Sequence, residues 1–400
     1  MKINSSLLWI AAICLLISGC SNYRELNQLG IITGMGIDQN DDPDKPYRVT
    51  YQVINPSGLS KSGSSGGQGP AVINYTITAK SLIEAYGKGS AIIPRENMIS
   101  HLSLIIINEE LARNGLDLLF DSFDRGKNTR KSIPIFIARG KTAEDVLGVI
   151  EPLEITPGKN IISTTKNNQK MYGSSNEVLV YETISALLSE GKDVSLPGIS
   201  IRNDSQKAKQ TGNFETTTPA ILEAKGLAIF SKGKMVRWLD GEKARAANFV
   251  TSEINSTPVV LPCGDKGNVT ITAIGVKSKI KTEIHHKQPV IYTSLNVMGE
   301  TLETSCELDL SNPKLLKEFE KKMANELKKQ IKKTINIAQK EKADIFGFGD
   351  ALSRTNPAYW RQHKKNWNNL FSDAQISMKV NVNIINSGMR MEPYESKYTK

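Results

Sequence analysis

The chain contains 400 residues, of which 39% are hydrophobic and 23% are charged, and its formal net charge is +10. This composition is ordinary for a globular protein. The length predicts two or three domains, because one core rarely grows beyond about 250–300 residues. Beyond Cys20, no apolar stretch approaches the roughly 20 residues that a membrane-spanning helix needs, so no transmembrane helix is predicted.

The start of the chain has the organisation of a bacterial lipoprotein signal. Lys2 precedes an apolar run from Leu7 to Ile17, and the small residues Ser18-Gly19 precede Cys20. The run is too short to span a bilayer and has the regions of a secretory signal. We therefore expect residues 1–19 to be a signal peptide and Cys20 to carry S-diacylglycerol and N-acyl groups that anchor the chain outside the cytoplasm. The alternative is an ordinary signal peptide, with Cys20 incidental.

Residues 20–201 are predicted to form an N-terminal α/β domain. Its strands are apolar or alternate apolar and polar residues, and its helices follow capping residues. The predicted strands are Leu29–Asp38, Tyr47–Ile54, Val72–Thr78, His101–Ile107 and Ile133–Ala138, and the predicted helices begin after Ser81, at Glu109 and after Thr142. The glycine- and serine-rich segment 57–70 is expected to be a mobile loop.

A polar segment at 202–219 is the predicted linker to a C-terminal domain over 220–390, with a possible further boundary near 290 and a tail at 391–400. This domain should begin with a hairpin that turns at Lys232-Gly233-Lys234, followed by a short helix that Asp240 caps. Strand patterns follow near 269–281, 289–299 and 301–310.

Two helices and a strand should complete the C-terminal domain. Asn312-Pro313 begins a helix that is predicted to continue to Asp344, and Asn356-Pro357 begins a second helix. Residues 376–384 alternate as in a half-buried strand. The fold class is therefore α+β, or mixed α/β: an elongated chain of two to three domains with mixed and antiparallel sheets flanked by helices. The sheet of the C-terminal domain is expected to be antiparallel.

Cysteine usage leaves the redox state of the C-terminal domain open. After signal removal and lipidation, only Cys263 and Cys306 remain, and an exported chain can oxidise them. Sequence does not place their Cα atoms within bridging range, and two free thiols are favoured over a disulfide.

Motifs for catalysis or for cofactor and metal binding are weak. Gly63-Ser-Ser65-Gly-Gly67 matches a nucleophile pattern, but it lies in a glycine- and serine-rich segment without the strand and helix that the motif needs. Gly140-Lys141-Thr142 lacks the first glycine of a phosphate loop. His285 and His286 would point to opposite faces of a strand, and Trp360 and Trp367 should pack against the long helix. We predict no enzyme activity, no cofactor and no metal.

The predicted helix from Lys314 to Asp344 carries ten lysines and five acidic residues. A solvated helix face is the favoured interpretation, and a face towards anionic lipid or an acidic partner is the alternative. Nucleic acid is disfavoured as a partner because the chain is predicted to be exported.

Motifs along the whole chain resemble the Ger(x)C spore-germination lipoproteins, the C subunits of nutrient germinant receptors. The most specific part is the end of the chain, where Asp344-Ile-Phe-Gly-Phe-Gly349 precedes Pro357, Trp360, Trp367 and Phe371. The other matching segments are Tyr23–Asn27, Gly34–Asp38, Tyr47–Pro56, Ile107–Ala112, Gly226–Phe230, Lys234–Leu239 and Gln339–Ala343. Ser21 departs from the family, which commonly has tryptophan after the lipidated cysteine.

The resemblance implies a lipid-anchored protein on the outer face of the inner spore membrane. There it would act with two polytopic subunits, A and B, in a receptor that senses small nutrients and triggers germination. The family has no established catalytic residues, so only Cys20 is carried over as a site. The alternative function is that of an exported lipoprotein that binds a solute and delivers a small nutrient to a membrane transporter.

Overall fold

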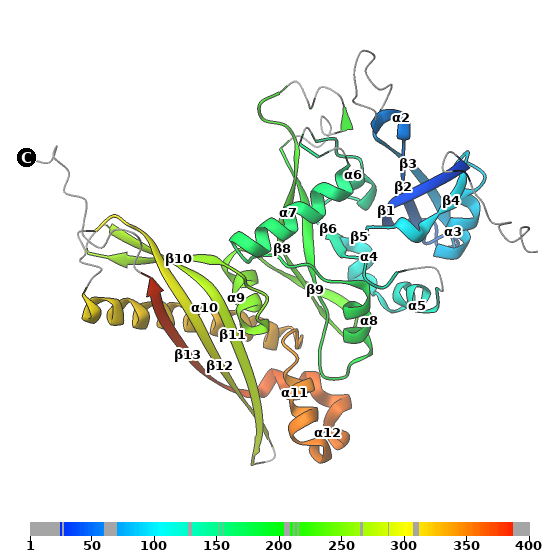
Figure 1. Ribbon diagram of the computed structural model, residues 1–400. Coiled ribbons are helices and arrows are strands. Elements are labelled where there is room, and N and C mark those ends of the chain that lie inside the picture. Colours follow the sequence, from blue (N-terminus) through cyan, green and yellow to red (C-terminus); the bar gives the residue numbers. More distant parts are fainter. Residues whose placement is uncertain are drawn as a thin grey trace, which may run out of the picture.

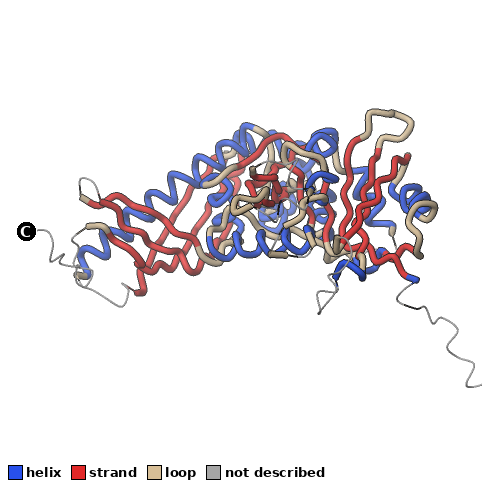
Figure 2. The backbone as a smooth tube through the Cα atoms, turned by 90° about the horizontal axis from the view of Figure 1, so that it is seen from above, coloured by secondary structure: helices blue, strands red, loops and turns tan. Residues whose placement is uncertain are grey.

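A computed structural model describes residues 25, 28–59, 70–126, 130–151, 153–154, 156–203, 209–210, 213, 216–264, 267–286, 288–306 and 312–386. Within this part of the chain, thirteen strands form two sheets, one of nine strands and one of four. The molecule is elongated, with the nine-stranded sheet at one end and the four-stranded sheet at the other (Figure 2). The predicted α+β class, with mixed sheets flanked by helices, is confirmed.

The nine-stranded sheet contains mixed parallel and antiparallel pairs. Its order is β3-β2-β1-β5-β6-β7-β8-β9, and β4 pairs with β1 beside this path. Strands β1, β5, β6 and β7 run parallel to one another, while β2, β3, β8 and β9 form antiparallel pairs at the two ends. The strands are β1 Leu29–Gln39, β2 Tyr47–Ile54, β3 Val72–Ala79, β4 Glu96–Met98, β5 Leu104–Asn108, β6 Ile135–Ala138, β7 Ser195–Arg202, β8 Ile221–Ser231 and β9 Lys234–Leu239.

Helices cover both faces of this sheet (Figure 1). One core contains apolar side chains of α3, α4, α5 and α8, and a second core on the other face contains those of α6 and α7. Continuous apolar strands such as β5 suit this arrangement, because both of their faces are buried. The helices are α2 Pro56–Leu59, α3 Leu82–Gly89, α4 Glu109–Asn114, α5 Asp117–Arg125, α6 Ala143–Leu147, α7 Pro157–Met171 and α8 Val180–Leu188, and η2 is Ile99–His101.

Predicted helix starts in this half are confirmed. The Ser81 side chain accepts a hydrogen bond from Glu84 N, and Thr142 forms a capping box with Asp145. Most of the predicted mobile loop 57–70, including the Gly63–Gly67 motif, lies outside the described residues.

The segment between β7 and β8 joins neighbouring strands of one sheet. Arg202 of β7 pairs with Ile221 of β8, so the strands before and after the predicted linker 202–219 are neighbours in the nine-stranded sheet. The predicted hairpin of β8 and β9 is present, with positive φ at Lys232 and Gly233. Asp240 precedes α9 (Glu242–Thr251), but its side chain forms an ion pair with Arg139 instead of capping the helix, so the prediction of a side-chain cap is wrong.

The four-stranded sheet has the order β10-β11-β12-β13. Its strands are β10 Thr257–Cys263, β11 Gly267–His285, β12 Gln288–Thr304 and β13 Gln375–Asn386. The two strands predicted near 289–299 and 301–310 form one strand as far as Thr304. The closing strand β13 runs parallel to β12, so the expectation of a fully antiparallel sheet is wrong. The helices between the two strands return the chain to the first residues of β12, where Gln375 pairs with Val290. Both strands therefore run in the same direction.

Helix α10 (Pro313–Lys340) covers one face of this sheet (Figure 1). Apolar side chains spaced three or four residues apart, from Phe319 to Ala338, form its buried side. The helix ends at Lys340, four residues before the predicted end, and Lys342 has φ +53°. The second predicted helix divides into shorter pieces, which are α12 Pro357–His363, η5 Lys364–Asn366 and α13 Trp367–Asp373, and α11 is Phe348–Thr355.

Cys263 and Cys306 form a disulfide, which corrects the expectation of two free thiols. The long pairing of β11 with β12 carries the chain back beside the β10–β11 turn, and this brings the two Cα atoms to 6.3 Å. Gly267 makes room for the bridge, because a Cβ atom there would lie 2.1 Å from Cys306 Sγ. Sequence separation alone did not reveal this proximity.

Candidate functional site

The loop between α10 and α11 contains a buried carboxylate, Asp344, and contacts the segment before β7. Its Oδ1 accepts hydrogen bonds from the backbone N–H groups of Phe346, Gly347 and Phe348, at 3.0–3.2 Å. Its Oδ2 accepts from Gly349 N and from Trp367 Nε1, both at 2.9 Å. Five donors therefore fix this loop around one side chain, which is fully buried.

The electrostatics of Asp344 reflect its burial. Burial raises the pKa of the Asp344 carboxyl to about 7, although its hydrogen bonds with Gly349, Trp367 and Phe348 oppose that rise. The neighbouring carboxylate of Asp193 raises the pKa further. Because backbone donors occupy both oxygens, this carboxyl group is a structural element of the loop, and it has no open side for a substrate.

Asp193, in the segment before β7, connects the N-terminal half to the Asp344 loop. Its Oδ2 accepts hydrogen bonds from Asp344 N and Asn368 Nδ2, and its Oδ1 accepts from Lys232 N, all at 2.9 Å. Its own N–H donates to Asp344 O at 2.8 Å. Burial raises the pKa of Asp193 against these hydrogen bonds. Segments more than 150 residues apart in the chain are thereby held together.

Glycine makes the closest part of this junction possible. A Cβ atom on Gly349 would lie 2.6 Å from Gly191 Cα, so neither position has room for a side chain. The backbone approach is held by Asp350 N, which donates to Gly191 O, and by Ser189 Oγ, which donates to Asp350 Oδ1 at 2.7 Å. The junction is thus a packed contact between the halves of the molecule.

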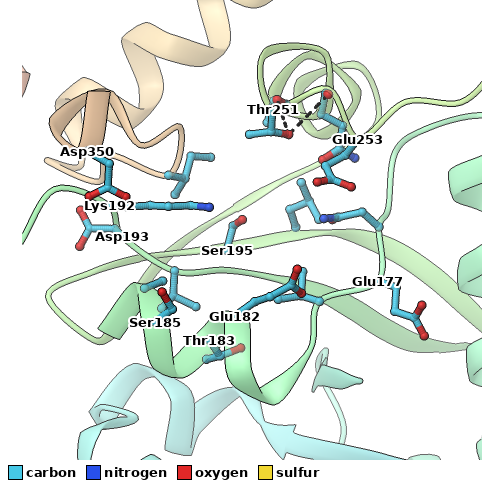
Figure 3. A pocket seen from close by; sticks show the side chains of 18 of the residues that line it. Glu177, Glu182, Thr183, Ser185, Lys192, Asp193, Ser195, Thr251, Glu253 and Asp350 are labelled. Carbon is cyan, nitrogen blue, oxygen red and sulfur yellow. Dashed lines mark hydrogen bonds between the residues drawn. The ribbon is translucent and has the colours of Figure 1, made fainter. Parts of the chain in front are cut away.

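A cavity of about 270 Å³ lies beside this junction (Figure 3). Lys192 extends into it from beside Asp193 and Asp350, and Glu253 and Glu182 lie on opposite walls. Burial raises the pKa of Glu253, the Glu182 carboxylate adds to that rise, and the Lys192 ammonium group opposes it. The cavity is therefore a polar space that carries charges of both signs.

The cavity contains hydroxyl groups and carboxylates, but no histidine lies in its lining. Ser195 lies in this lining without an imidazole to act as its base. In the described part of the chain, no group of three or more His, Cys, Asp or Glu side chains is placed to hold a metal ion. The cavity can bind a small polar molecule by charge, and its residues do not form a nucleophile–base pair.

The residues singled out from the sequence lie in different places. Cys20 lies outside the described residues, so its lipidation stays a prediction. Trp367 is buried in the same core as the apolar side of α10. Its ring meets that of Trp360 edge to face, with 5.6 Å between the ring centroids, so both residues pack as predicted. His285 pairs with Glu283 on the surface, while His286 lies in the turn after β11 with φ +50° and is not on the strand as expected.

The basic face of α10 is exposed, as predicted for a solvated helix. All nine lysines of this helix are exposed, and among the described residues only Lys322 forms an ion pair, with Glu318. No described helix is long and apolar enough to cross a membrane.

Sequence reasoning missed the junction and the cavity. Asp193 and Gly191 carry no local pattern, and their partners are distant in the chain. Glu182 caps α8 by accepting a hydrogen bond from Leu179 N. Glu182 follows Leu179 by three residues, and this spacing is a helix-start signal that the sequence contains. The Asp344–Gly349 segment was found only through the family resemblance.

Two family models match the chain in sequence order. The "Spore germination protein N-terminal domain" matches residues 22–201, and the "Spore germination B3/ GerAC like, C-terminal" domain matches residues 225–388. The chain belongs to the Ger(x)C family of spore germination proteins. The two family models flank the segment between β7 and β8 and leave it unmatched.

Full-length relatives of this Ger(x)C protein carry related names. It is 29% identical to spore germination protein KC of Bacillus subtilis (strain 168) over 391 residues, which are 96% of each chain. It is 26% identical to spore germination protein B3 of the same organism, over 94% of this chain and 95% of that one. The crystal structure of the GerBC protein has the same fold, with a TM-score of 0.52 and 20% identity over 88% of this chain and 97% of that chain.

Proposed function

We propose that this protein is the lipid-anchored C subunit of a spore nutrient germinant receptor and supports assembly or signalling without catalysing a reaction. The observation that carries the proposal is the match to two germination domains in the family's order, over most of the chain. Germination is the process named for each relative above. In this account, polytopic A and B subunits are the receptor partners.

The membrane attachment in this proposal depends on Cys20. The signal-like segment 1–19 ends at that cysteine. Two acyl chains suffice for stable anchoring, at about 0.8 kcal/mol per buried methylene. We place the protein on the outer face of the inner spore membrane. Its two main units are residues 20–201 and 220–390, and the second contributes β8 and β9 to the nine-stranded sheet of the first.

The arrangement of buried carboxylates supports a non-catalytic role. A catalytic carboxyl group with a raised pKa must reach a substrate. Asp344 and Asp193 instead use their oxygens to hold backbone and side-chain N–H groups at the junction. Their raised pKa values therefore follow from packing the two halves together.

The second candidate, solute capture, is favoured by the polar cavity beside Lys192. A solute-binding lipoprotein would bind a nutrient without other receptor subunits. Isothermal titration of the purified full chain with the amino acids and sugars that trigger germination distinguishes the two functions. Saturable binding would favour solute capture. Absence of binding would favour the receptor subunit, which does not need to bind a nutrient by itself.

Deletion of the gene tests the proposal in spores. Optical-density loss is measured after addition of a nutrient panel and, separately, of calcium dipicolinate as a nutrient-independent trigger. We expect the deletion to abolish the response to some nutrients and to leave the dipicolinate response intact, with recovery on complementation. Normal responses to every nutrient in spores that lack all sister receptors would contradict the proposal.

A further inference from the structure

Strand β13 is the free edge of the four-stranded sheet, and α10 runs beside it (Figure 1). Only β12 pairs with β13 among the described strands. The edge is long, because β13 spans twelve residues from Gln375 to Asn386. A free edge of this length is a surface on which another strand can pair.

The outward backbone groups of β13 can be assigned from one contact. Ile384 N donates to Glu320 Oε1 at 3.0 Å, so the backbone of Ile384 faces away from β12. Backbone groups alternate between the two edges of a strand with a period of two. Ile376, Met378, Val380 and Val382 therefore also present their N–H and C=O groups outward, and in the described part of the chain these groups have no backbone partner on that side.

A groove of about 410 Å³ separates this edge from α10. Lys328 and Lys332 line its helical side, Ile335 forms part of its floor, and Ile376 and Met378 line the strand side. No carboxylate lines the groove. Both lysines are exposed, and neither forms an ion pair with a described residue. The groove thus combines uncompensated positive charge, an apolar floor and free strand hydrogen-bonding groups.

We propose that this groove binds an extended acidic segment of a partner protein, which adds to the sheet as a strand along β13. Its backbone would pair with the outward groups between Ile376 and Val382, and alternate side chains would contact the apolar floor. Acidic side chains would reach Lys328 and Lys332. A lipid surface offers no backbone to pair with β13, so a peptide segment is the occupant that uses every feature of the groove.

The site has a defined length. Glu320 occupies the outward N–H of Ile384, so this end of the edge is closed. The groove borders this edge from Ile376 to Met378, and the free edge continues beyond it to Val382. The whole free part matches a segment of about seven residues, since strands rise by about 3.3 Å per residue. This inference rests on the groove itself and does not depend on the germination role.

Peptide binding to the full-length chain in detergent tests the charge requirement. The probe is a fluorescently labelled octapeptide in which every second residue is in turn valine or glutamate and the residues between them are threonine, so that both kinds of side chain face α10, and the readout is anisotropy. We expect saturable binding that Lys328→Glu with Lys332→Glu weakens at least tenfold. The matched control, Lys329→Glu with Lys333→Glu, changes the same charge on the same helix outside the groove, and it should change the affinity less than twofold.

Strand pairing is tested separately by removing backbone donors. Val380→Pro removes an outward N–H that does not bond to β12 and leaves the groove side chains in place, so the sheet should persist by circular dichroism while binding falls at least tenfold. An octapeptide N-methylated at alternate residues should also fail to bind. The proposal is overturned by equal weakening in both lysine pairs or by undiminished binding of the N-methylated peptide. It is also overturned by absence of peptide binding, including the case in which phosphatidylglycerol vesicles bind through Lys328 and Lys332 instead.

Discussion

The two sheets of this protein are built in different ways. Central strands of the nine-stranded sheet are buried on both faces between helices, as Ile105 and Ile106 of β5 illustrate on opposite sides. In the four-stranded sheet, α10 covers one face, and polar residues such as Lys379 and Asn381 of β13 are exposed on the other. The comparison indicates that the first sheet is an internal scaffold and that the second leaves a face and an edge for other molecules.

The largest expected effect comes from breaking the junction between the two regions. In Asp344→Asn, one acceptor oxygen becomes an NH₂ group facing N–H donors, which leaves at least two buried donors unpaired. At about 1–3 kcal/mol for each, we expect a loss of about 5 kcal/mol in the free energy of unfolding, measured with urea. Asp41→Asn on the exposed surface is the control and should change it by less than about 0.5 kcal/mol. A loss below about 1 kcal/mol in Asp344→Asn would contradict this role.

The second largest expected effect comes from the disulfide Cys263–Cys306. It closes a separation of 43 residues in the four-stranded sheet. Its removal by Cys306→Ser should lower the free energy of unfolding by about 4 kcal/mol, because the unfolded chain gains entropy. The double variant with Cys263→Ser should differ little from the single variant, since either change removes the bond. Wild-type stability that is unchanged by dithiothreitol would show that the bridge does not form.

Equivalent truncations in the two sheets compare their packing directly. Ile106→Ala, in a strand buried on both faces, should destabilise the protein by about 3–4 kcal/mol. Ile384→Ala, the same truncation on the half-buried strand β13, should reduce stability by about 1–2 kcal/mol. Urea unfolding at equal protein concentration measures both, and similar losses would remove the proposed difference between the sheets.

A pH series sharpens the description of the nine-stranded sheet. Burial raises the pKa of Asp38 to about 6, despite hydrogen bonds from Ala143 N and Glu144 N. The folded state therefore binds the proton more tightly than the unfolded state, and the contribution of Asp38 to stability is lost as the pH rises from about 4 through 6. Between pH 4 and pH 7, the free energy of unfolding of the wild type should fall by up to about 3 kcal/mol relative to that of Asp38→Asn. A difference that is constant with pH would refute the shift.

Local sequence patterns predicted the elements better than their pairing. The caps at Ser81, Thr142 and Asn312 are present where the sequence places them, because a cap depends on neighbours within three residues. The parallel direction of β13 and the continuity of the sheet across 202–219 depend on contacts between distant segments. Nothing in the local pattern encodes such contacts.

The candidate site was predictable only in part, for the same reason. The apolar stripe of α10 and its lysine face follow from helical periodicity. The cavity beside Lys192 needs Glu182 and Glu253 to meet from separate elements, and the groove needs β13 to be an edge strand. Both features arise from tertiary structure.

The most direct test of the proposed function compares wild-type spores with spores that carry Cys20→Ala, with Cys14→Ala as the matched control inside the signal segment. The membrane-bound fraction of the protein and nutrient-triggered optical-density loss are measured on the same preparations. We expect Cys20→Ala to release the protein from the membrane and to impair the nutrient response, while Cys14→Ala leaves both unchanged. Retention on the membrane with a normal nutrient response in Cys20→Ala would contradict the lipid-anchored receptor subunit.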